Sequence, residues 1–479
     1  MTGHIGWDNY AGVNGFGASS PFSAQDLEAI NKALTAGGDI NNPGAAPGQG
    51  FPLRVESLER TLKNLTYRME HIRLFKAIPK LTAYNTVEEH NEIQSYGAGS
   101  EGFVAEGALP PADDTTYERK YAAVKFLGTT RSVTHVMSLV KPAHGNVIAN
   151  ETVSGTMWLL RILERALFYG DSTLSSIQFD GYEKLITDNA PVDNIIDMRG
   201  EPLNEDVLQD GALSISDAPN YGIPTHIHLN PKVKADLIKG FFPKGRYELM
   251  DKRDDGLVGL DIRGFTSPAG KVMFEPNVFV NDGGPPPSAA AGDASKIPTA
   301  PSISTAATTP PDAASKFGAA DAGNYFYSIS AHNDDGRTAA IAVDAAAIAV
   351  AAGDKVTFGI TPGAGPAVKW YELYRTKKGG AVGDQRLIAR IPNTAGAGEL
   401  TVDDFNDRLP FTSSAFMWQQ NLECLSWKQL APFLKVPLAT IDASIRWMQL
   451  VYGTPVLYAP GKAVLFKNVG RAPNYKGQP

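Results

Sequence analysis

The sequence of 479 residues contains a single cysteine, Cys424, which excludes an internal disulfide framework and suits a reducing compartment. No histidine stands beside this thiol in the sequence, so we expect it to be buried rather than nucleophilic. Basic residues are not in excess either, because 44 Lys and Arg stand against 51 Asp and Glu, a net charge of −7. General nucleic-acid binding needs a basic face, so this balance argues against it. It does not exclude a protein that encloses DNA without binding it tightly.

Long apolar runs are also missing. No stretch approaches the roughly 20 residues of a membrane span, and the polar start MTGHIGWDNY lacks the apolar core of a signal peptide. We therefore expect a soluble protein that is made in the cytosol and has no membrane partner. The remaining composition is that of a globular protein, with 43% hydrophobic and 20% charged residues and length for about two to four domains.

Motifs that carry chemistry are scarce, and the sequence predicts no catalytic, cofactor-binding or metal site. His226 and His228 alternate along a predicted strand, as a pair of metal ligands would, but no motif supplies the third ligand that zinc needs, which favours structural histidines. The run DKRDDG at 251–256 lacks the spacing and distal glutamate of a calcium loop, and NDDG at 333–336 is typical of a hairpin turn. Neither a phosphate-binding glycine loop nor a nucleophile elbow occurs.

The strongest secondary-structure signal lies in residues 147–170, where apolar residues recur at helical spacing on almost every side. Asn146 or Asn150 can cap the start of this helix, and Gly170 is expected to turn left-handed after its last turn. Only Arg161, Glu164 and Arg165 interrupt the apolar cover. A helix of this kind must be packed on nearly every side, and the core helix of a globular enzyme is its ordinary interpretation.

The chain before this helix divides into three parts. Residues 1–52, rich in Gly, Ala, Asn and Pro, form an extended arm, and an amphipathic helix is predicted over 53–75, stopped by Pro79. Extended segments at 87–96 and 115–130 flank a turn region and predict a two-stranded ribbon. Neither arm shows a clean apolar face, and such a ribbon is only marginally stable alone, so it should lie on a neighbouring subunit. The surface hairpin of an enzyme is an equal alternative at this point.

Mixed α/β character follows the long helix. Residues 225–242 predict a strand, a turn and a helix, and 270–280 predict a strand pair. The Pro/Ala/Ser/Thr tract from 281 to 324 has no periodicity and is interpreted as a linker. Short, regularly spaced strands then predict a β-sandwich of about seven strands that ends near 409–410. Its core residues are expected to include the following: Tyr325, Tyr327, Ile329, Trp370, Leu373 and Tyr374.

The return of α/β character after residue 410 marks the sandwich as an insertion into a loop. Insertions of this kind succeed at exposed loops, so we expect residues 285–409 to form an independently folded, dispensable module on an outer surface.

The order of these segments in an α+β chain resembles the major capsid protein of tailed bacteriophages, above all the head proteins of large contractile-tailed phages that carry an immunoglobulin-like insertion. The resemblance covers nearly the whole chain after about residue 53. The matching motifs are GSEGFVAE (99–106), ERALFYGDSTL (164–174), FDGYEKLI (179–186), KVPLATIDASI (435–445), YG (452–453), APGK (459–462) and KNV (467–469).

This resemblance implies a fold of the Hong Kong 97 type with an inserted immunoglobulin-like sandwich. The implied segments are an N-terminal arm (1–52), an N-terminal helix with the start of the peripheral domain (53–85), an extended E-loop (86–131), the peripheral domain with its spine helix (132–174), an axial domain (175–284 and 410–450), the insertion (285–409) and C-terminal strands of the peripheral domain (451–479).

The implied function is structural rather than enzymatic and needs no cofactor. The chain would assemble with itself, as hexamers and pentamers, into an icosahedral head that encloses double-stranded DNA without sequence-specific binding. Decoration or cement proteins, a portal and a scaffold are the other implied partners. The location would be the virion, after synthesis and assembly in the cytoplasm of the bacterial host. An encapsulin-like nanocompartment shell is the main alternative, and a cytosolic enzyme with an added sandwich is the third.

Two processing reactions occur in parts of this family. Many relatives lose an N-terminal piece by proteolysis, and removal of such a piece from this chain is left open. Some relatives join a loop lysine to an asparagine, and Lys120 and Lys125 lie in the predicted ribbon. Because nothing in the sequence identifies the buried carboxylate that would take the proton, we predict no covalent cross-linking.

Overall fold

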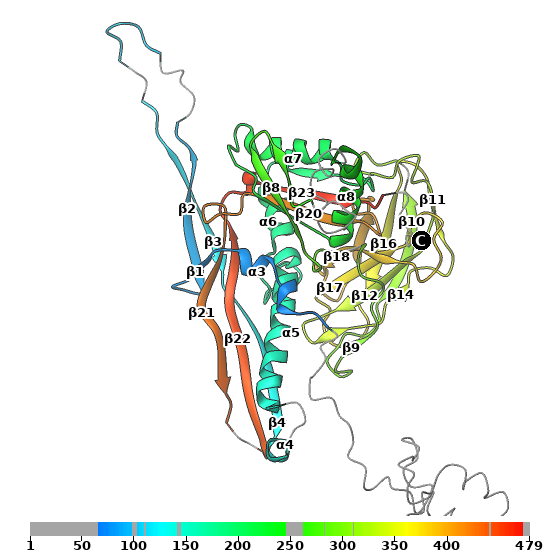
Figure 1. Cartoon of the computed structure of the whole chain (residues 1–479). Helices are drawn as coiled ribbons and strands as arrows, with labels where there is room; N and C mark the ends of the chain where they lie inside the picture. Colours follow the sequence, from blue (N-terminus) through cyan, green and yellow to red (C-terminus); the bar gives the residue numbers. More distant parts are fainter. Residues whose placement is uncertain are drawn as a thin grey trace, which may run out of the picture. The chain divides into compact units, whose positions relative to one another are not determined.

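A computed structural model describes residues 66–97, 103–109, 112–140, 145–245, 262–281, 283–309, 311–439 and 442–472. Within these residues the fold is α+β with more strands than helices, as expected. Figure 1 shows its longest helix, α5 (Val147–Tyr169), beside a sheet of long strands. The Asn146 side chain accepts hydrogen bonds from the N–H groups of Ile148 and Ala149, so Asn146 is the cap of this helix.

The second half of α5 is enclosed by the chain and the first half is not. Leu159, Leu163 and Leu167 are fully buried, whereas Val153 is 63% exposed. The expected packing on nearly every side is therefore met only near the C-terminal end of the helix. Gly170 has a φ of −62°, so the expected left-handed conformation is wrong. Glycine is needed there because a Cβ atom would lie 2.5 Å from the Phe179 carbonyl oxygen.

A four-stranded sheet lies next to α5. Its order is β1 (Lys80–Thr82), β21 (Leu425–Pro437), β22 (Ser444–Leu457) and β4 (Lys125–Thr134). β1 is parallel to β21, and the other pairs are antiparallel. β22 runs unbroken across residue 450, so the expected boundary between the segments 410–450 and 451–479 falls inside a strand.

A second sheet has six strands in the order β5 (Ile195–Asp197), β23 (Ala463–Val469), β20 (Ser413–Trp418), β6 (His226–Leu229), β8 (Gly270–Pro276) and β7 (Gly264–Ser267). Alternate residues of β20 enter two different cores. Phe416 and Trp418 pack in the core that includes the buried half of α5, and Ala415 and Met417 pack in a second core. Burial on both faces explains why residues 415–418 of this strand are continuously apolar.

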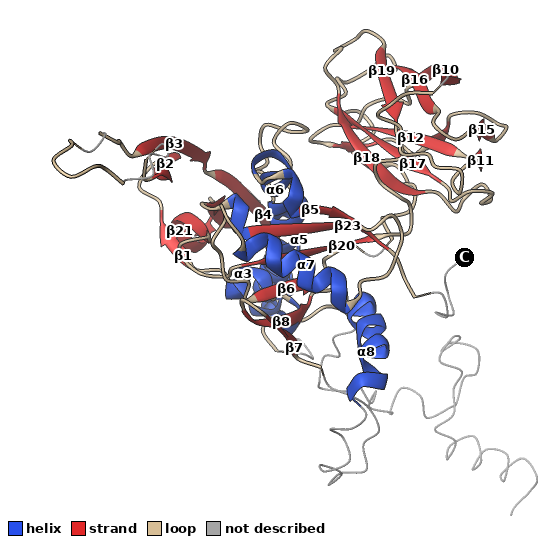
Figure 2. Cartoon of the chain, turned by 90° about the horizontal axis from the view of Figure 1, so that it is seen from above, coloured by secondary structure: helices blue, strands red, loops and turns tan. Residues whose placement is uncertain are grey.

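Three helices accompany this sheet, namely α6 (Tyr182–Asn189), α7 (Glu205–Ser216) and α8 (Pro231–Gly245), as Figure 2 shows. Buried residues of α6 belong to the first core, and those of α7 and α8 belong to the second. β6 and α8 confirm the predicted strand, turn and helix. The expected strand pair at 270–280 is a single strand, β8, which pairs with β6 and β7 and is followed by a turn in which the Val280 N–H donates to the Asn277 carbonyl.

The continuous helix expected over 53–75 is not found in its described part, and residues 53–65 lie outside the described residues. A short 3-10 turn, Met69–His71, and the one-turn helix α3 (Leu74–Ala77) replace it. Extended Ile72, with a ψ of 97°, separates the two. The break follows from Glu164 of α5, whose carboxylate accepts the backbone N–H groups at the start of α3 and so begins a new helix there.

An all-β unit lies between β8 and β20. A three-stranded sheet of β10 (Ser302–Thr309), β16 (Lys355–Thr361) and β19 (Leu400–Asp404) shares one core with a six-stranded sheet. That second sheet contains β18 (Arg386–Pro392), β17 (Trp370–Arg375), β12 (Tyr327–His332), β13 (Gly336–Arg337) and β9 (Ala291–Gly292), with β14 (Ile341–Ala342) also on β12. A further pair joins β11 (Gly323–Tyr325) to β15 (Ile348–Val350).

The linker interpretation of residues 281–324 is wrong, because β9 and β10 belong to this unit and Phe317 is 2% exposed in its core. β10 pairs with β16 over most of its length. Its Ser, Ala and Thr side chains show no apolar alternation, so only the backbone ladder identifies it as a strand. Of the predicted core residues, Trp370 is only partly buried and stacks on His332, with ring centroids 5.3 Å apart. The other five are buried.

Candidate assembly surfaces

A ribbon that is separate from the larger sheets is formed by β2 (Val87–Ser95) and β3 (Thr116–Ala123), as Figure 1 shows. The strands are antiparallel, with Val87 opposite Ala123, Glu89 opposite Tyr121 and Ile93 opposite Tyr117. Residues directly opposite in a ladder lie on the same face. This pairing therefore gathers Val87, Ile93, Tyr117 and Tyr121 on one side of the ribbon, which we call the outer ribbon face.

The outer ribbon face is strongly exposed within the chain. The exposed fractions are 45% for Val87, 53% for Ile93, 70% for Tyr117 and 78% for Tyr121. Arg119 lies among them, with its Nη1 atom 3.3 Å from a Glu89 carboxylate oxygen and its Nε atom 3.2 Å from the Asn91 side-chain oxygen. Glu89, Asn91 and Arg119 share this side with the four apolar residues, so neither arm has a clean apolar face, as expected. Only the register of the two strands brings the apolar residues together.

The opposite ribbon face is charged and is held to the body at its base. Lys120 Nζ lies 2.8 Å from Glu92, and the His90 ring nitrogen lies 3.0 Å from the other oxygen of the same carboxylate. Glu88 pairs with Lys428 of β21, and the His90 ring meets Tyr458 edge-on at 4.9 Å. The base is thus fixed by polar contacts, and the aromatic side points away from them.

The return strand predicted at 115–130 is two strands that meet at Val124. β3 pairs with β2, whereas β4 pairs with β22 along its whole length, from Lys125 opposite Gly453 to Thr134 opposite Ser444. Val124 between them is 4% exposed, and its N–H donates to the Thr86 carbonyl. The free-standing ribbon therefore ends at residue 123 rather than 131.

A second exposed apolar patch, which we call the tip patch, surrounds the short helix α4 (His135–Leu139). Val136, Leu139 and Val140 are 67%, 73% and 53% exposed. α4 contacts both β4 and α5. Several exposed apolar side chains so close together on one chain are typical of a surface that another molecule covers.

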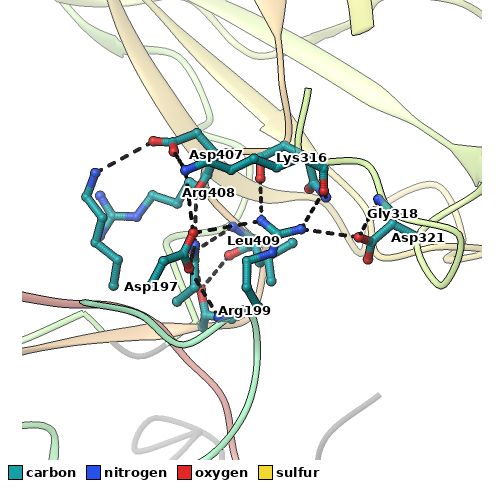
Figure 3. Close-up of polar contacts among 12 residues, drawn as sticks. Asp197, Arg199, Lys316, Gly318, Asp321, Asp407, Arg408 and Leu409 are labelled. Atoms are coloured by element: carbon teal, nitrogen blue, oxygen red, sulfur yellow. Dashed lines mark hydrogen bonds and ion pairs between the residues drawn. The ribbon is translucent and has the colours of Figure 1, made fainter. Parts of the chain in front are cut away.

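A network of charged residues joins the all-β unit to the rest of the chain (Figure 3). Arg199, which follows β5, donates to the carbonyl oxygens of Asn406 and Lys316, both at 2.7 Å, and pairs with Asp321 at 3.2 Å. Arg408 donates to Glu183 of α6 at 2.7 Å. We call this network the seam. Lys316 and Asp321 of the seam lie within residues 281–324, which again contradicts the interpretation of that tract as a linker.

Ion pairs inside the seam lower the pKa of one of its carboxyl groups, that of Asp407. Lys316 contacts Asp407 and also lies 3.6 Å from Asp197, and Lys467 of β23 lies 3.6 Å from Asp407. Burial alone would raise the pKa of Asp407, but these two lysines hold it below its usual value. Asp407 therefore stays ionised at neutral pH.

The histidines that the sequence singled out are structural within the described chain. His228 is fully buried against Trp418 and Phe168, and its Nε2 atom lies 3.1 Å from the Gln420 side-chain oxygen. Burial lowers the pKa of His228 to about 4, so the ring is neutral at pH 7. His226 is partly buried and contacts Thr225. The described residues contain no group of three or more His, Cys, Asp or Glu that could hold a metal ion.

The structure also shows the surroundings of the other residues that the sequence singled out. Cys424 is buried, as predicted, and burial raises the pKa of its thiol to about 12. The NDDG run at 333–336 forms the β12–β13 turn. Lys120 pairs with Glu92, and Lys125 donates to the Ser176 carbonyl. Residues 251–256 lie outside the described part. No described helix is long and apolar enough to cross a membrane.

One buried carboxylate was missed by sequence reasoning. Glu164 is 0% exposed, and it accepts the N–H groups of Arg73, Leu74 and Phe75 at 3.1, 2.6 and 2.9 Å. The Asn277 side chain donates to the same carboxylate at 2.6 Å. Burial raises the pKa of Glu164, although these four donors act in the opposite direction. In the sequence, the signal for this buried carboxylate was a charged residue, Glu164, within an otherwise apolar helical stretch.

Comparison with known proteins identifies relatives but no family model, since a scan against family models finds no match. The major capsid protein of Staphylococcus phage K is 26% identical over 436 residues, covering 87% of this chain and 90% of the relative. The putative major capsid protein of Enterococcus phage phiEF24C is 25% identical over 441 residues, with the same two shares covered. Among solved structures, the capsid of a native GTA particle has a TM-score of 0.46 at 10% identity, covering 91% of this chain and all of that one.

The assignment rests on the sequence relatives, which span nearly the full length of both chains. They are phage capsid proteins, which favours the phage capsid over the nanocompartment shell that the sequence alone left open. The motif order from the ribbon to the C-terminal strands agrees with this assignment. The chain is therefore a major capsid protein of the tailed-phage family.

Proposed function

We propose that copies of this chain assemble as hexamers and pentamers into an icosahedral head around double-stranded phage DNA, after synthesis in the cytoplasm of the bacterial host. The observation that carries the proposal is the outer ribbon face, whose aromatic and aliphatic side chains have no cover in their own chain. Another copy of the same protein is the natural cover, because the sequence relatives are capsid proteins.

Each part of the chain has a role in this proposal, which adopts the Hong Kong 97 arrangement. The ribbon, now bounded at 86–123, acts as the E-loop and lies on an adjacent subunit. The spine helix α5 and the four-stranded sheet form the peripheral domain, and the six-stranded sheet with α6, α7 and α8 forms the axial domain. Residues 1–52 act as an arm. The β-sandwich at 285–409 is an immunoglobulin-like insertion on the outer surface, where decoration proteins would also bind.

The outer ribbon face can contribute substantially to assembly. Complete burial of a large apolar side chain contributes about 1.5–3 kcal/mol relative to exposure. Four such residues, each roughly half to three-quarters exposed, therefore supply on the order of 4–8 kcal/mol per copy before the costs of association are subtracted. A shell repeats this contact many times, so even a modest net gain at each ribbon stabilises the whole particle.

The direct test is the double substitution Tyr117→Ser with Tyr121→Ser. Both tyrosines are exposed in the subunit, so the variant should fold normally and remain soluble but fail to form closed shells in electron microscopy. Tyr221→Ser is the matched control, because Tyr221 is 74% exposed outside the ribbon. Deletion of residues 96–111 should have the same effect as the double substitution. Normal shells from the double variant, with circular dichroism unchanged, would contradict the proposed role of the ribbon.

A further inference from the structure

Residues 67–82 cross the buried half of α5 and continue onto the four-stranded sheet, as Figure 1 shows. Glu164 of α5 accepts the N–H groups at the start of α3, and the Phe75 ring meets the Trp427 ring edge-on at 5.6 Å. β1, at the end of this segment, pairs with β21. The backbone of the segment is therefore fixed to the body of the chain at several points.

The exposed side of this segment is basic. Arg68, Lys76 and Lys80 are exposed, and so is Arg161 on the adjoining turn of α5. No carboxylate in the described part of the chain forms an ion pair with any of these four side chains, which we call the basic face. The segment carries one exposed carboxylate, that of Glu70, so positive charge is in excess here although the whole chain has a net charge of −7.

Aromatic rings position two of these cations without neutralising them. The Arg161 guanidinium lies 5.4 Å from the centre of the Tyr67 ring, and Lys80 Nζ lies 4.7 Å from the centre of the Phe75 ring. A ring attracts a cation through its quadrupole and leaves the charge uncancelled. The seam is different, because its basic residues are paired with carboxylates. The charge of the basic face is therefore available to an anion from outside the chain.

We propose that the basic face binds the phosphate backbone of double-stranded DNA and is the surface that each subunit turns toward the enclosed DNA. Duplex DNA carries one negative charge per about 1.7 Å of its axis, so several cations on one surface meet phosphates in any register and need no contact with the bases. The two arginines can each donate two parallel hydrogen bonds to a phosphate group. The net negative charge of the chain keeps this binding weak. The inference rests on the proposed function for the identity of its ligand.

The experiment measures the binding of a short fluorescent DNA duplex to the full-length chain, kept as unassembled subunits, by fluorescence anisotropy over a range of salt concentrations. Three or four phosphate contacts predict a dissociation constant of about 1–100 µM at low salt and a slope of about −3 to −4 for log affinity against log salt. The test variant, Arg68→Gln with Lys76→Gln, should bind about tenfold more weakly or less, with a slope shallower by about 2.

The matched control is Lys296→Gln with Arg337→Gln, which removes the same two kinds of charge from exposed positions on the all-β unit. Thermal midpoints check that both variants fold. Weaker binding and a shallower slope in the test variant, with the control unchanged, support the proposal. An equal loss in both variants shows a response to overall charge and overturns it, as does the absence of binding by the unaltered chain.

Electron microscopy of the same variants separates this inference from the proposed function. A test variant that builds normal shells but binds DNA more weakly supports the basic face as a DNA contact. A test variant that binds DNA normally but builds no shells assigns these side chains to a contact between subunits and overturns the inference. If the unaltered chain forms no shells while its DNA binding still depends on Arg68 and Lys76, the proposed function fails and the basic face stands.

Discussion

Removing the Glu164 carboxylate should loosen the start of α3, because four donors converge on this one group. In a Glu164→Ala variant the N–H groups of Arg73, Leu74 and Phe75 lose their acceptor in a buried place, and the Asn277 amide loses its partner. Each unsatisfied buried donor costs about 1–3 kcal/mol. The gain from no longer burying a charge offsets part of this sum. We expect a net loss of about 2–4 kcal/mol in the free energy of unfolding.

The Glu164→Gln variant is the matched comparison. Glutamine keeps one oxygen for the N–H groups of Arg73 and Leu74, but it places an NH₂ group against the N–H of Phe75, which now donates to the second carboxylate oxygen. Its stability should therefore lie between those of the parent and the alanine variant. Urea denaturation of unassembled subunits gives the free energies, and hydrogen exchange of the 72–78 segment locates the effect. An alanine variant within about 0.5 kcal/mol of the parent would refute this account of the N-terminal anchor.

The raised pKa of Glu164 also predicts the direction in which stability changes with pH. Folding raises the pKa of Glu164 above its ordinary value of 4.5, so the folded chain binds more protons than the unfolded chain between these two values. The contribution of Glu164 to stability is thus fully present below pH 4.5 and declines as pH rises through the raised pKa. The advantage of the parent over Glu164→Ala should shrink across that window. An advantage that grew with pH would mean that the four hydrogen bonds outweigh burial.

Further predictions concern the seam, the insertion, the lysines of the ribbon and the buried histidine. Arg199→Ala removes three contacts to the insertion from a side chain that is 33% exposed, and it should lower the free energy of unfolding by about 1–2 kcal/mol in urea denaturation, whereas Lys296→Ala should not. Replacing residues 285–409 with a short Gly/Ser linker should still give shells of normal size in electron microscopy, but with a lower thermal midpoint. Denaturing gels of mature particles should show one band, and a ladder of multimers would contradict the absence of cross-links. His228 should remain neutral down to about pH 5 in a histidine NMR titration, and protonation near pH 6.5 would show that its burial is misjudged.

The sequence predicts best those elements whose signals lie within one short stretch of the chain. α5 can be predicted because its helical periodicity and its cap at Asn146 lie within one stretch, and β12 can be predicted because Tyr327, Ile329 and Ala331 alternate with polar residues. β10 could not be found this way, since its partner β16 lies about fifty residues later and its small side chains carry no pattern. A strand of this kind can be recognised only from its backbone hydrogen bonds to the neighbouring strand.

The features that matter for assembly depend on register and on distant neighbours. Tyr117 and Tyr121 alternate along β3, so one half of the outer ribbon face was visible in the sequence, but only pairing with β2 adds Ile93 and Val87 to the same side. Glu164 appeared as a simple interruption of an apolar helix. Its burial became apparent only when α3 and Asn277, both far away in the sequence, were found around it.

The change of partner at Val124 has a mechanical consequence. The ladder of β3 with β2 ends there, and the ladder of β4 with β22 begins one residue later, so neither set of pairings extends across the junction. Rotation about the backbone at residues 86 and 124 would swing the ribbon as a unit, resisted by the hydrogen bond from Val124 to Thr86, the Glu88–Lys428 pair and the contact of His90 with Tyr458. In the proposed shell, this movement would let one amino-acid sequence reach neighbours at different inclinations while its sheets keep their register. The curvature of the shell would then be accommodated at the junction of the ribbon rather than by deformation of the packed cores.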